Sequence, residues 1–119
     1  MMSGPIDDAT VERLRGELLA QRDQLRAEIE AEGADPDGDD VTFAGDRGFA
    51  DRSHSTEERS RAISLVRSLR VTLRDVERAV DRIDAGTYGT CERCGRPIAP
   101  ERLEALPWTS RCIDHAGAP

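Results

Sequence analysis

The chain has 119 residues, a formal net charge of −7, and 34% charged but only 3% aromatic residues. This composition is thin for a compact core and typical of long solvated helices. Its acidity argues against sequence-specific DNA binding, which requires a basic face. No apolar run approaches the ~20 residues of a membrane span and no signal peptide is recognisable, so we expect a cytoplasmic protein with reduced thiols and no membrane contact.

Two amphipathic helices are predicted after an N-terminal tail of residues 1–9. The first runs from about Thr10 to Glu32, and its apolar stripe is interrupted by Gln21 and consists of Val11, Leu14, Leu18, Leu25 and Ile29. The second covers about residues 55–84, where apolar residues alternate spacings of four and three as in a coiled-coil seam: Ala62, Val66, Leu69, Leu73, Val76, Val80 and Ile83. Gly86 supplies the expected stop.

Neither helix can bury its stripe alone. The predicted fold class is therefore all-α: an antiparallel coiled-coil hairpin of two helices over residues 10–86, with a small C-terminal zinc finger. Pairing with a second copy of the chain is the other physical solution, and Gln21 in the seam suits either arrangement. If the helices pair from the loop end, the shorter one stops near Val76. The finger is then expected to cover the end of the longer helix, with residues 1–9 helping.

The connection between the helices, the tip loop of about residues 33–54, is longer than the 2–8 residues usual in helical bundles. Its acidic stretch, residues 35–40, is expected to be solvated. The stretch that follows holds both phenylalanines of the chain, Phe43 and Phe49. They either cap the end of the coiled coil or contact a partner.

Two ligand pairs, each separated by two residues, lie near the end of the chain: Cys91 with Cys94, and Cys112 with His115. Such pairs are what a tetrahedral zinc site requires, and Gly95 allows the tight turn after the first pair. Four protein ligands leave no open coordination position. We therefore predict one structural zinc in a Cys3His finger of residues 87–116, followed by a tail of residues 117–119.

The finger resembles that of the DksA/TraR family, bacterial regulators that bind RNA polymerase. The resemblance covers roughly residues 43–115 and includes Tyr88–Gly95, Ile98, Arg102–Ala105, Pro107 and Cys112–Asp114. Residues 50–52 (Ala-Asp-Arg) resemble the tip motif of the family. In that family the hairpin enters the secondary channel of the polymerase, and a tip aspartate acts near the catalytic magnesium.

By this resemblance Asp51 takes the role of the tip aspartate and Arg52 flanks it. We expect the partner-contacting tip to include Asp46, Phe49, Asp51, Arg52 and Ser53. The chain departs from the family at His115, where a fourth cysteine is frequent, and at Ser53, where better-known members have alanine. Ser68, Asp75 and Ala116 stand where members that bind guanosine tetraphosphate have basic residues, so we do not expect that effector to bind.

Two functions remain open from the sequence. The first is a monomeric, non-enzymatic transcription regulator that binds RNA polymerase. The second is a zinc-capped coiled-coil adaptor or dimerisation protein without polymerase activity, which would have no use for Asp51 at the tip. A zinc hydrolase is set aside, because it needs an open metal position.

Overall fold

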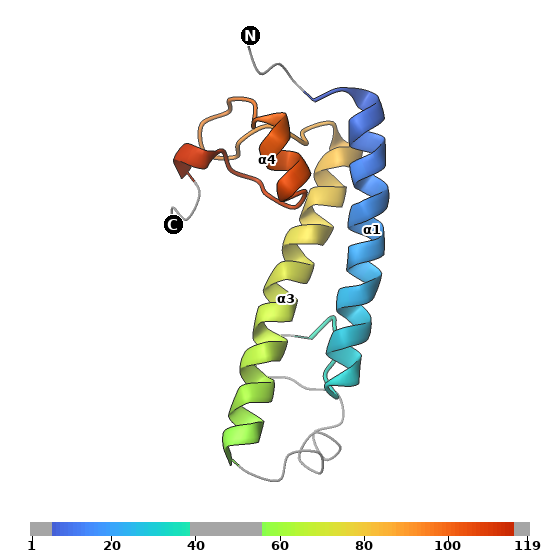
Figure 1. The fold of residues 1–119 in the computed structure, drawn as a ribbon, viewed down its shortest axis with the longest axis vertical. Coiled ribbons are helices and arrows are strands. Elements are labelled where there is room, and N and C mark those ends of the chain that lie inside the picture. The colour runs from blue at the N-terminus through green and yellow to red at the C-terminus, as the bar shows by residue number, and fades with distance from the viewer. Residues whose placement is uncertain (1–5, 39–55, 116–119) are drawn as a thin grey trace. The chain divides into compact units, whose positions relative to one another are not determined.

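The computed structural model describes residues 6–38 and 56–115, which form three α-helices and one 3-10 helix (Figure 1). These are α1 Asp8–Ala31, α3 Thr56–Ala85, α4 Pro100–Ala105 and η1 Ile113–His115. The described residues contain no β-strand, only an isolated antiparallel bridge between Thr90 and Pro97. None of the helices in these two ranges is long and apolar enough to cross a membrane.

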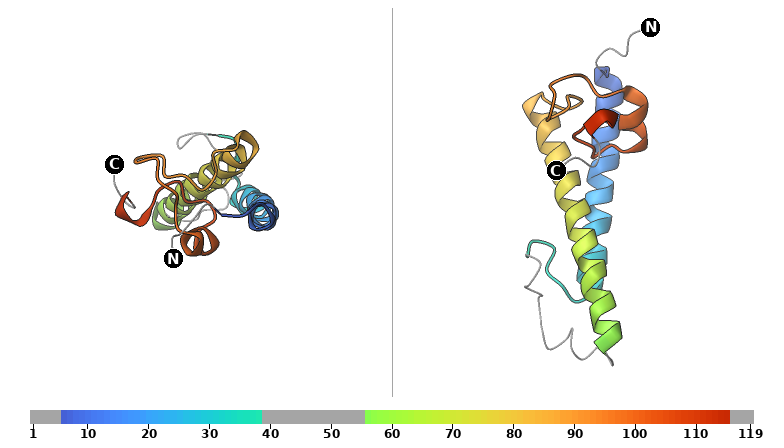
Figure 2. Two further views of the ribbon diagram at one scale, coloured as in Figure 1. Left: turned by 90° about the horizontal axis from the view of Figure 1, so that it is seen from above. Right: turned by 90° about the vertical axis from the view of Figure 1, so that its left-hand side faces the viewer.

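Contacts divide the chain into two compact units, one of residues 1–21 and 75–119 and the other of residues 22–74. In each unit a segment of α1 lies beside a segment of α3 and runs in the opposite direction (Figure 1; Figure 2). The helical part of the predicted fold class is therefore confirmed: two antiparallel helices precede a small C-terminal module.

Apolar side chains form the core of each unit. In the unit of residues 1–21 and 75–119 the core includes Leu14, Leu18, Val76, Ala79, Val80, Cys91, Ile98 and Leu103. In residues 22–74 it includes Leu25, Ile29, Ala34, Val66 and Leu73. Leu69, which the heptad pattern places in the seam, is only half-buried, whereas the next residue, Arg70, is buried. The buried face of α3 is thus turned slightly away from the predicted one.

Helix α1 starts at Asp8, slightly before the predicted Thr10, because Asp7 caps it. The backbone N–H of Thr10 donates to Oδ1 of Asp7 (2.8 Å), and the N–H of Val11 donates to the carbonyl of Asp7 (3.0 Å). Aspartate is a preferred N-cap residue because its carboxylate accepts from these first N–H groups. Hydrogen bonds with the side chain and then with the backbone of Thr10 lower the pKa of the Asp7 carboxyl.

Both long helices end in the same glycine cap. Gly33 and Gly86 have positive φ angles of 85° and 79°. The N–H after each glycine donates back across the turn to a carbonyl of the helix, in the pairs Ala34 to Ile29 (3.2 Å) and Thr87 to Arg82 (2.9 Å). This is the Schellman arrangement that glycine favours, and it confirms the stop predicted at Gly86.

The shorter helix does not stop near Val76, so that expectation was wrong. The guanidinium of Arg15 donates through Nε and an NH2 group to the carboxylate of Asp84 (3.2 and 3.4 Å), so α1 accompanies α3 to its last turn. Helix lengths alone do not fix the register of two paired helices, so the pairing need not start at the loop end. The C-terminal module consequently contacts both helices, and Ile6 packs against it as expected of residues 1–9.

Candidate metal centre

The first cysteine pair lies on a tight turn held by backbone hydrogen bonds. The N–H of Cys91 donates to the carbonyl of Arg96 (2.8 Å), and the N–H of Gly95 donates to the carbonyl of Cys91 (2.9 Å). Gly95 has a φ of 75°, a conformation that glycine adopts without steric cost. The N–H of Arg93 points at the Sγ of Cys91 (3.4 Å). The turn therefore places the N–H of Arg93 where it can stabilise the thiolate of Cys91.

Cys112 brings a third thiol to this turn. Its Sγ lies 3.8 Å from that of Cys94, and the Sγ atoms of Cys91, Cys94 and Cys112 all lie within 4.8 Å of one another. Thiolates bound to a tetrahedral zinc at about 2.3 Å are about 3.8 Å apart. The three sulfurs thus fit a zinc ion and leave one coordination position for another ligand. The backbone of His115 belongs to η1, just after Cys112, but its side chain lies outside the described residues.

The thiols differ in acidity. Burial acts to raise the pKa of the Cys91 thiol, but hydrogen bonds from the backbone of Cys112, Cys94 and Arg93 outweigh it and bring the pKa to about 6. Burial and the hydrogen bond with Cys91 raise the pKa of Cys112. Because the thiolate is the form that binds a metal, the surroundings of Cys91 favour the metal-binding form of its side chain.

Apolar residues surround the sulfurs. Cys91 lies in a buried cluster with Leu14 of α1 and with Ile98 and Leu103 of the C-terminal module. Tyr88 packs against the same cluster, and its hydroxyl donates to the carbonyl of Pro107 (2.8 Å). The cluster joins the first turns of α1 to the cysteine turn. The apolar pattern of the sequence predicts Leu14 only as part of the helix seam, so this contact is an addition to the predicted fold.

Arg82 ties the cysteine turn to α3. One NH2 group of its guanidinium donates to the backbone carbonyls of Thr87 (3.3 Å) and Thr90. Its other terminal nitrogen lies 3.7 Å from the carboxylate of Glu92. Glu92 also accepts from Nε of Arg111 (3.1 Å), and this hydrogen bond lowers the pKa of the Glu92 carboxyl. The charged side chains of Arg82, Glu92 and Arg111 thus connect the last turns of α3 with the segments that carry Cys91 and Cys112.

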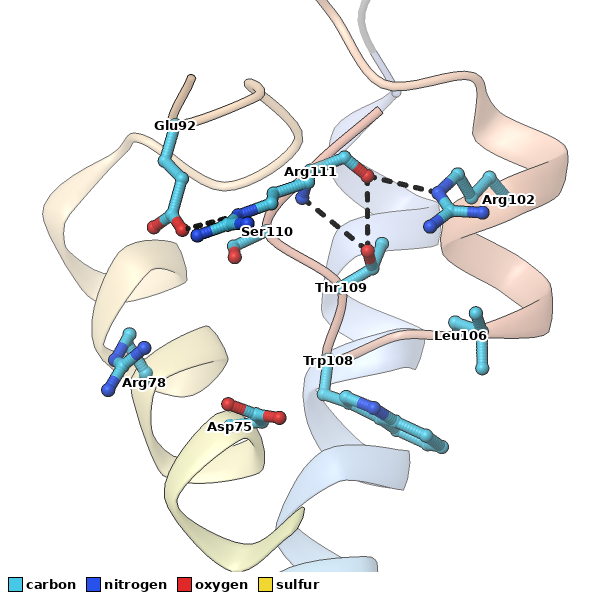
Figure 3. Close-up of a pocket in the computed structure, with 9 residues that line it drawn as sticks. All are labelled: Asp75, Arg78, Glu92, Arg102, Leu106, Trp108, Thr109, Ser110 and Arg111. Carbon is cyan, nitrogen blue, oxygen red and sulfur yellow. Dashed lines mark hydrogen bonds and ion pairs between the residues drawn. The ribbon is translucent and has the colours of Figure 1, made fainter. Parts of the chain in front are cut away.

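A pocket of about 290 Å³ lies beside these charged side chains and was not predicted. Figure 3 shows Asp75 and Arg78 of α3 on one side, with Arg102 of α4 and Leu106, which follows α4, on the other. The lining is completed by Glu92, Trp108, Thr109, Ser110 and Arg111. Burial raises the pKa of the Asp75 carboxyl, Arg78 opposes this, and Glu92 adds to it. Nε of Arg102 donates to the carbonyl of Arg111 (3.0 Å), so the guanidinium of Arg102, which lines the pocket, also forms a hydrogen bond within the fold.

The predicted tip residues lie outside the described residues. They are Asp46, Phe49, Asp51, Arg52 and Ser53. Their roles therefore stay predictions from the sequence.

The family model described as the prokaryotic dksA/traR C4-type zinc finger matches residues 86–114. Among curated proteins, an uncharacterised protein of Aquifex aeolicus is 54% identical over 41 residues, which are 34% of this chain and 28% of that protein. The match thus spans little more than a quarter of that relative. The RNA polymerase-binding transcription factor DksA of Escherichia coli K12 is 29% identical over 111 residues, which are 92% of this chain and 70% of that protein.

The solved structure of transcription factor DksA2 from Pseudomonas aeruginosa has the same fold. The TM-score is 0.68 at 30% sequence identity, and the match covers 92% of this chain and 82% of the other. The finger match together with the three converging thiols confirms that the cofactor is structural zinc. The family finger is of the C4 type, whereas this chain has only 3 cysteines.

Proposed function

This chain belongs to the DksA/TraR family, and from that membership we propose that it is a transcription regulator that binds RNA polymerase. The alignment with the E. coli factor carries the proposal, because it extends over nearly the whole chain and therefore beyond the zinc finger. The proposed route is the secondary channel of the polymerase. The tip would reach the active centre while the finger remains a structural module.

The proposed effector is the carboxylate of Asp51. A carboxylate beside a pair of catalytic magnesium ions competes for their coordination positions or shifts their bound water. Arg52 flanks it and Ser53 follows, and Asp46 and Phe49 complete the proposed contact surface. Ser53 in place of the alanine of better-known members is the departure that bears most directly on the strength of the effect.

The proposed zinc ligands are Cys91, Cys94, Cys112 and His115. The three sulfurs that converge leave one coordination position, and the chain has no fourth cysteine to fill it. His115 follows Cys112 at the same spacing as Cys94 follows Cys91. Zinc stoichiometry and affinity of His115→Ala test this assignment: affinity equal to that of the wild type would remove His115 from the set, whereas His115→Cys should restore tight binding.

The proposal describes a non-enzymatic, monomeric, cytoplasmic protein that does not read DNA sequence. Four protein ligands would close the zinc to substrate. A net charge of −7 disfavours the phosphate backbone of a duplex. Ser68, Asp75 and Ala116 stand where members that bind guanosine tetraphosphate have basic residues, so the proposal does not include that effector.

The experiment separates binding from action at the tip. Asp51→Asn keeps the size of the side chain and removes its charge, so we expect unchanged affinity for RNA polymerase and loss of the effect on transcription from a short-lived open complex. Asp81→Asn is the matched control, because Asp81 is an exposed aspartate of α3 and the substitution removes the same charge away from the tip. It should bind and regulate like the wild type.

Two results would count against the proposal. No measurable binding of the wild-type chain to RNA polymerase removes the partner and favours a zinc-capped adaptor. Binding with unchanged regulation by Asp51→Asn keeps the partner but removes Asp51 as the effector, and directs attention to Phe49 and its neighbours.

A further inference from the structure

Arg70 is the only charged side chain that is buried among the residues that the structure describes, with 1% of its surface exposed. It lies in the unit of residues 22–74, on the face of α3 where an apolar residue would be expected. Burying a guanidinium is costly unless hydrogen bonds compensate for the lost water. A charge at this position therefore indicates that its hydrogen bonds have a use which an apolar side chain would not serve.

The partner of Arg70 is the backbone just after α1. Its Nε and one NH2 group both donate to the carbonyl of Asp35 (3.2 and 2.7 Å). Hydrogen bonds from a charged donor are stronger than neutral ones, particularly away from water. The carbonyl of Asp35 also accepts from the N–H of Gly38 (3.0 Å), and Oδ1 of Asp35 accepts from the N–H of Asp37 (2.9 Å). Arg70 thus holds the residue on which this turn is built.

Two further arginines hold the same segment. Both terminal nitrogens of Arg26 donate to the carboxylate of Asp37 (2.8 and 2.9 Å), which lowers the pKa of that carboxyl. One NH2 group of Arg74 reaches the carbonyl of Gly38 (3.4 Å). We call Arg26, Arg70 and Arg74 the loop clamp. Arg70 is its buried member, and the other two act at the surface.

The loop clamp holds the segment that follows α1 against α3. After Gly33 the backbone turns back on itself (Figure 1), and the clamp keeps Gly38 beside Arg74. Arg74 lies about 27 Å along the axis of α3 from Thr56, at 1.5 Å per residue. Without the clamp, the segment from Gly33 to Gly38 would no longer be tied to α3.

We propose that Arg70 is a positioning residue for the tip: it fixes one end of the connection that carries Asp51, while Thr56 at the start of α3 fixes the other. This role rests on the proposed function. When both ends of the connection are fixed, binding costs less conformational entropy, which is the advantage of preorganisation. A buried arginine with a purely structural role would change only the stability of the fold.

The test compares Arg70→Met with Arg67→Met. Both remove one positive charge from α3, but Arg67 is exposed and makes no contact with the clamped segment among the described hydrogen bonds. In Arg70→Met, amide exchange at Asp37 and Gly38 should accelerate about tenfold, because the carbonyl that organises the turn is released. Exchange around the zinc finger should not change. Arg67→Met should leave both regions unchanged.

The functional readout is the maximal effect on transcription at saturating protein, measured well below the unfolding temperature beside the affinity for RNA polymerase. We expect Arg70→Met to keep the affinity within about threefold and to lose about tenfold of the maximal effect. Equal maximal effects in Arg70→Met and the wild type would overturn the positioning role. A wild-type chain without any effect on the polymerase would instead overturn the proposed function.

Arg70→Lys decides the question if Arg70→Met does not fold. Lysine keeps the charge but lacks the planar fork that places two N–H groups on one carbonyl. Accelerated exchange at Asp37 and Gly38 with a reduced maximal effect supports the proposal, whereas slow exchange with full regulation contradicts it.

Discussion

Leu14 of α1 and Cys91 of the zinc finger belong to one buried cluster, with 0% and 1% of their surfaces exposed. The helix therefore contributes to the packing that surrounds a metal-binding thiol. A substitution in α1 near Leu14 should therefore affect the zinc finger, and loss of the zinc should affect α1, although Leu14 and Cys91 are far apart in the sequence.

Leu14→Ala should reduce both stability and zinc affinity. Removing a fully buried leucine costs about 2–5 kcal/mol of unfolding free energy, and the cavity would open beside Cys91. Leu25→Ala is the matched control, since Leu25 is buried in the unit of residues 22–74. It should lower stability without changing zinc affinity. The measurements are urea unfolding and competition with a zinc chelator; equal zinc affinities in the two variants would contradict the coupling.

Removal of zinc should loosen more than the finger. Because structural zinc contributes directly to folding, chelation should accelerate amide exchange over residues 88–112 and also in the first turns of α1 around Leu14. Exchange around Val66 should stay slow. The single tryptophan of the chain, Trp108, should report the change by fluorescence. Unchanged exchange in α1 after complete zinc removal would show that the cluster survives without the metal.

The parts of the fold that could be predicted are those set by local chemistry. The alternation of apolar residues predicts two helices, and Gly86 predicts where the second one ends. The paired ligand spacing predicts the turn on which Cys91 and Cys94 converge with Cys112. Each of these features depends on residues close together in the sequence, and turn geometry or periodicity reports them directly.

The features that were missed depend on contacts between distant segments. Nothing in the sequence near Arg70 indicates that it turns inward, because its partner is a backbone carbonyl at Asp35. The pairing of Arg15 with Asp84 could not be read from helix lengths, because lengths alone do not fix the register of two paired helices. An arginine immediately beside a seam position was a signal available in the sequence, but it did not identify its partner.

Tyr88 should ionise late. Burial, supported by the charge of Glu17 and opposed by Arg82, raises the pKa of Tyr88 from 10.0 to about 12. Between pH 10 and about 12, Tyr88 ionises in the unfolded chain but not in the folded one. Its contribution to the free energy of unfolding is therefore fully present below pH 10 and is lost as the pH rises through about 12. Tyrosinate absorbance measures this directly, since the chain has 1 tyrosine.

Tyr88→Phe is the companion variant for that titration. It removes the hydrogen bond to the carbonyl of Pro107 at a cost of about 1 kcal/mol, and it should abolish the tyrosine-dependent loss of stability between pH 10 and 12. Tyrosinate formation near pH 10 in the folded wild-type chain would contradict the burial of the hydroxyl.

The same substitution should have opposite effects at two glycines. Gly16 lies in the exposed middle of α1, where an added Cβ meets nothing within 4 Å, so Gly16→Ala should stabilise the chain by about 0.5–1 kcal/mol through helix propensity. Gly95 also has open space around it, but its φ of 75° disfavours alanine by about 1–2 kcal/mol. Gly95→Ala should therefore lower stability and zinc affinity together. Thermal unfolding and chelator competition distinguish the two; a neutral Gly95→Ala would mean that the cysteine turn can form without the left-handed residue.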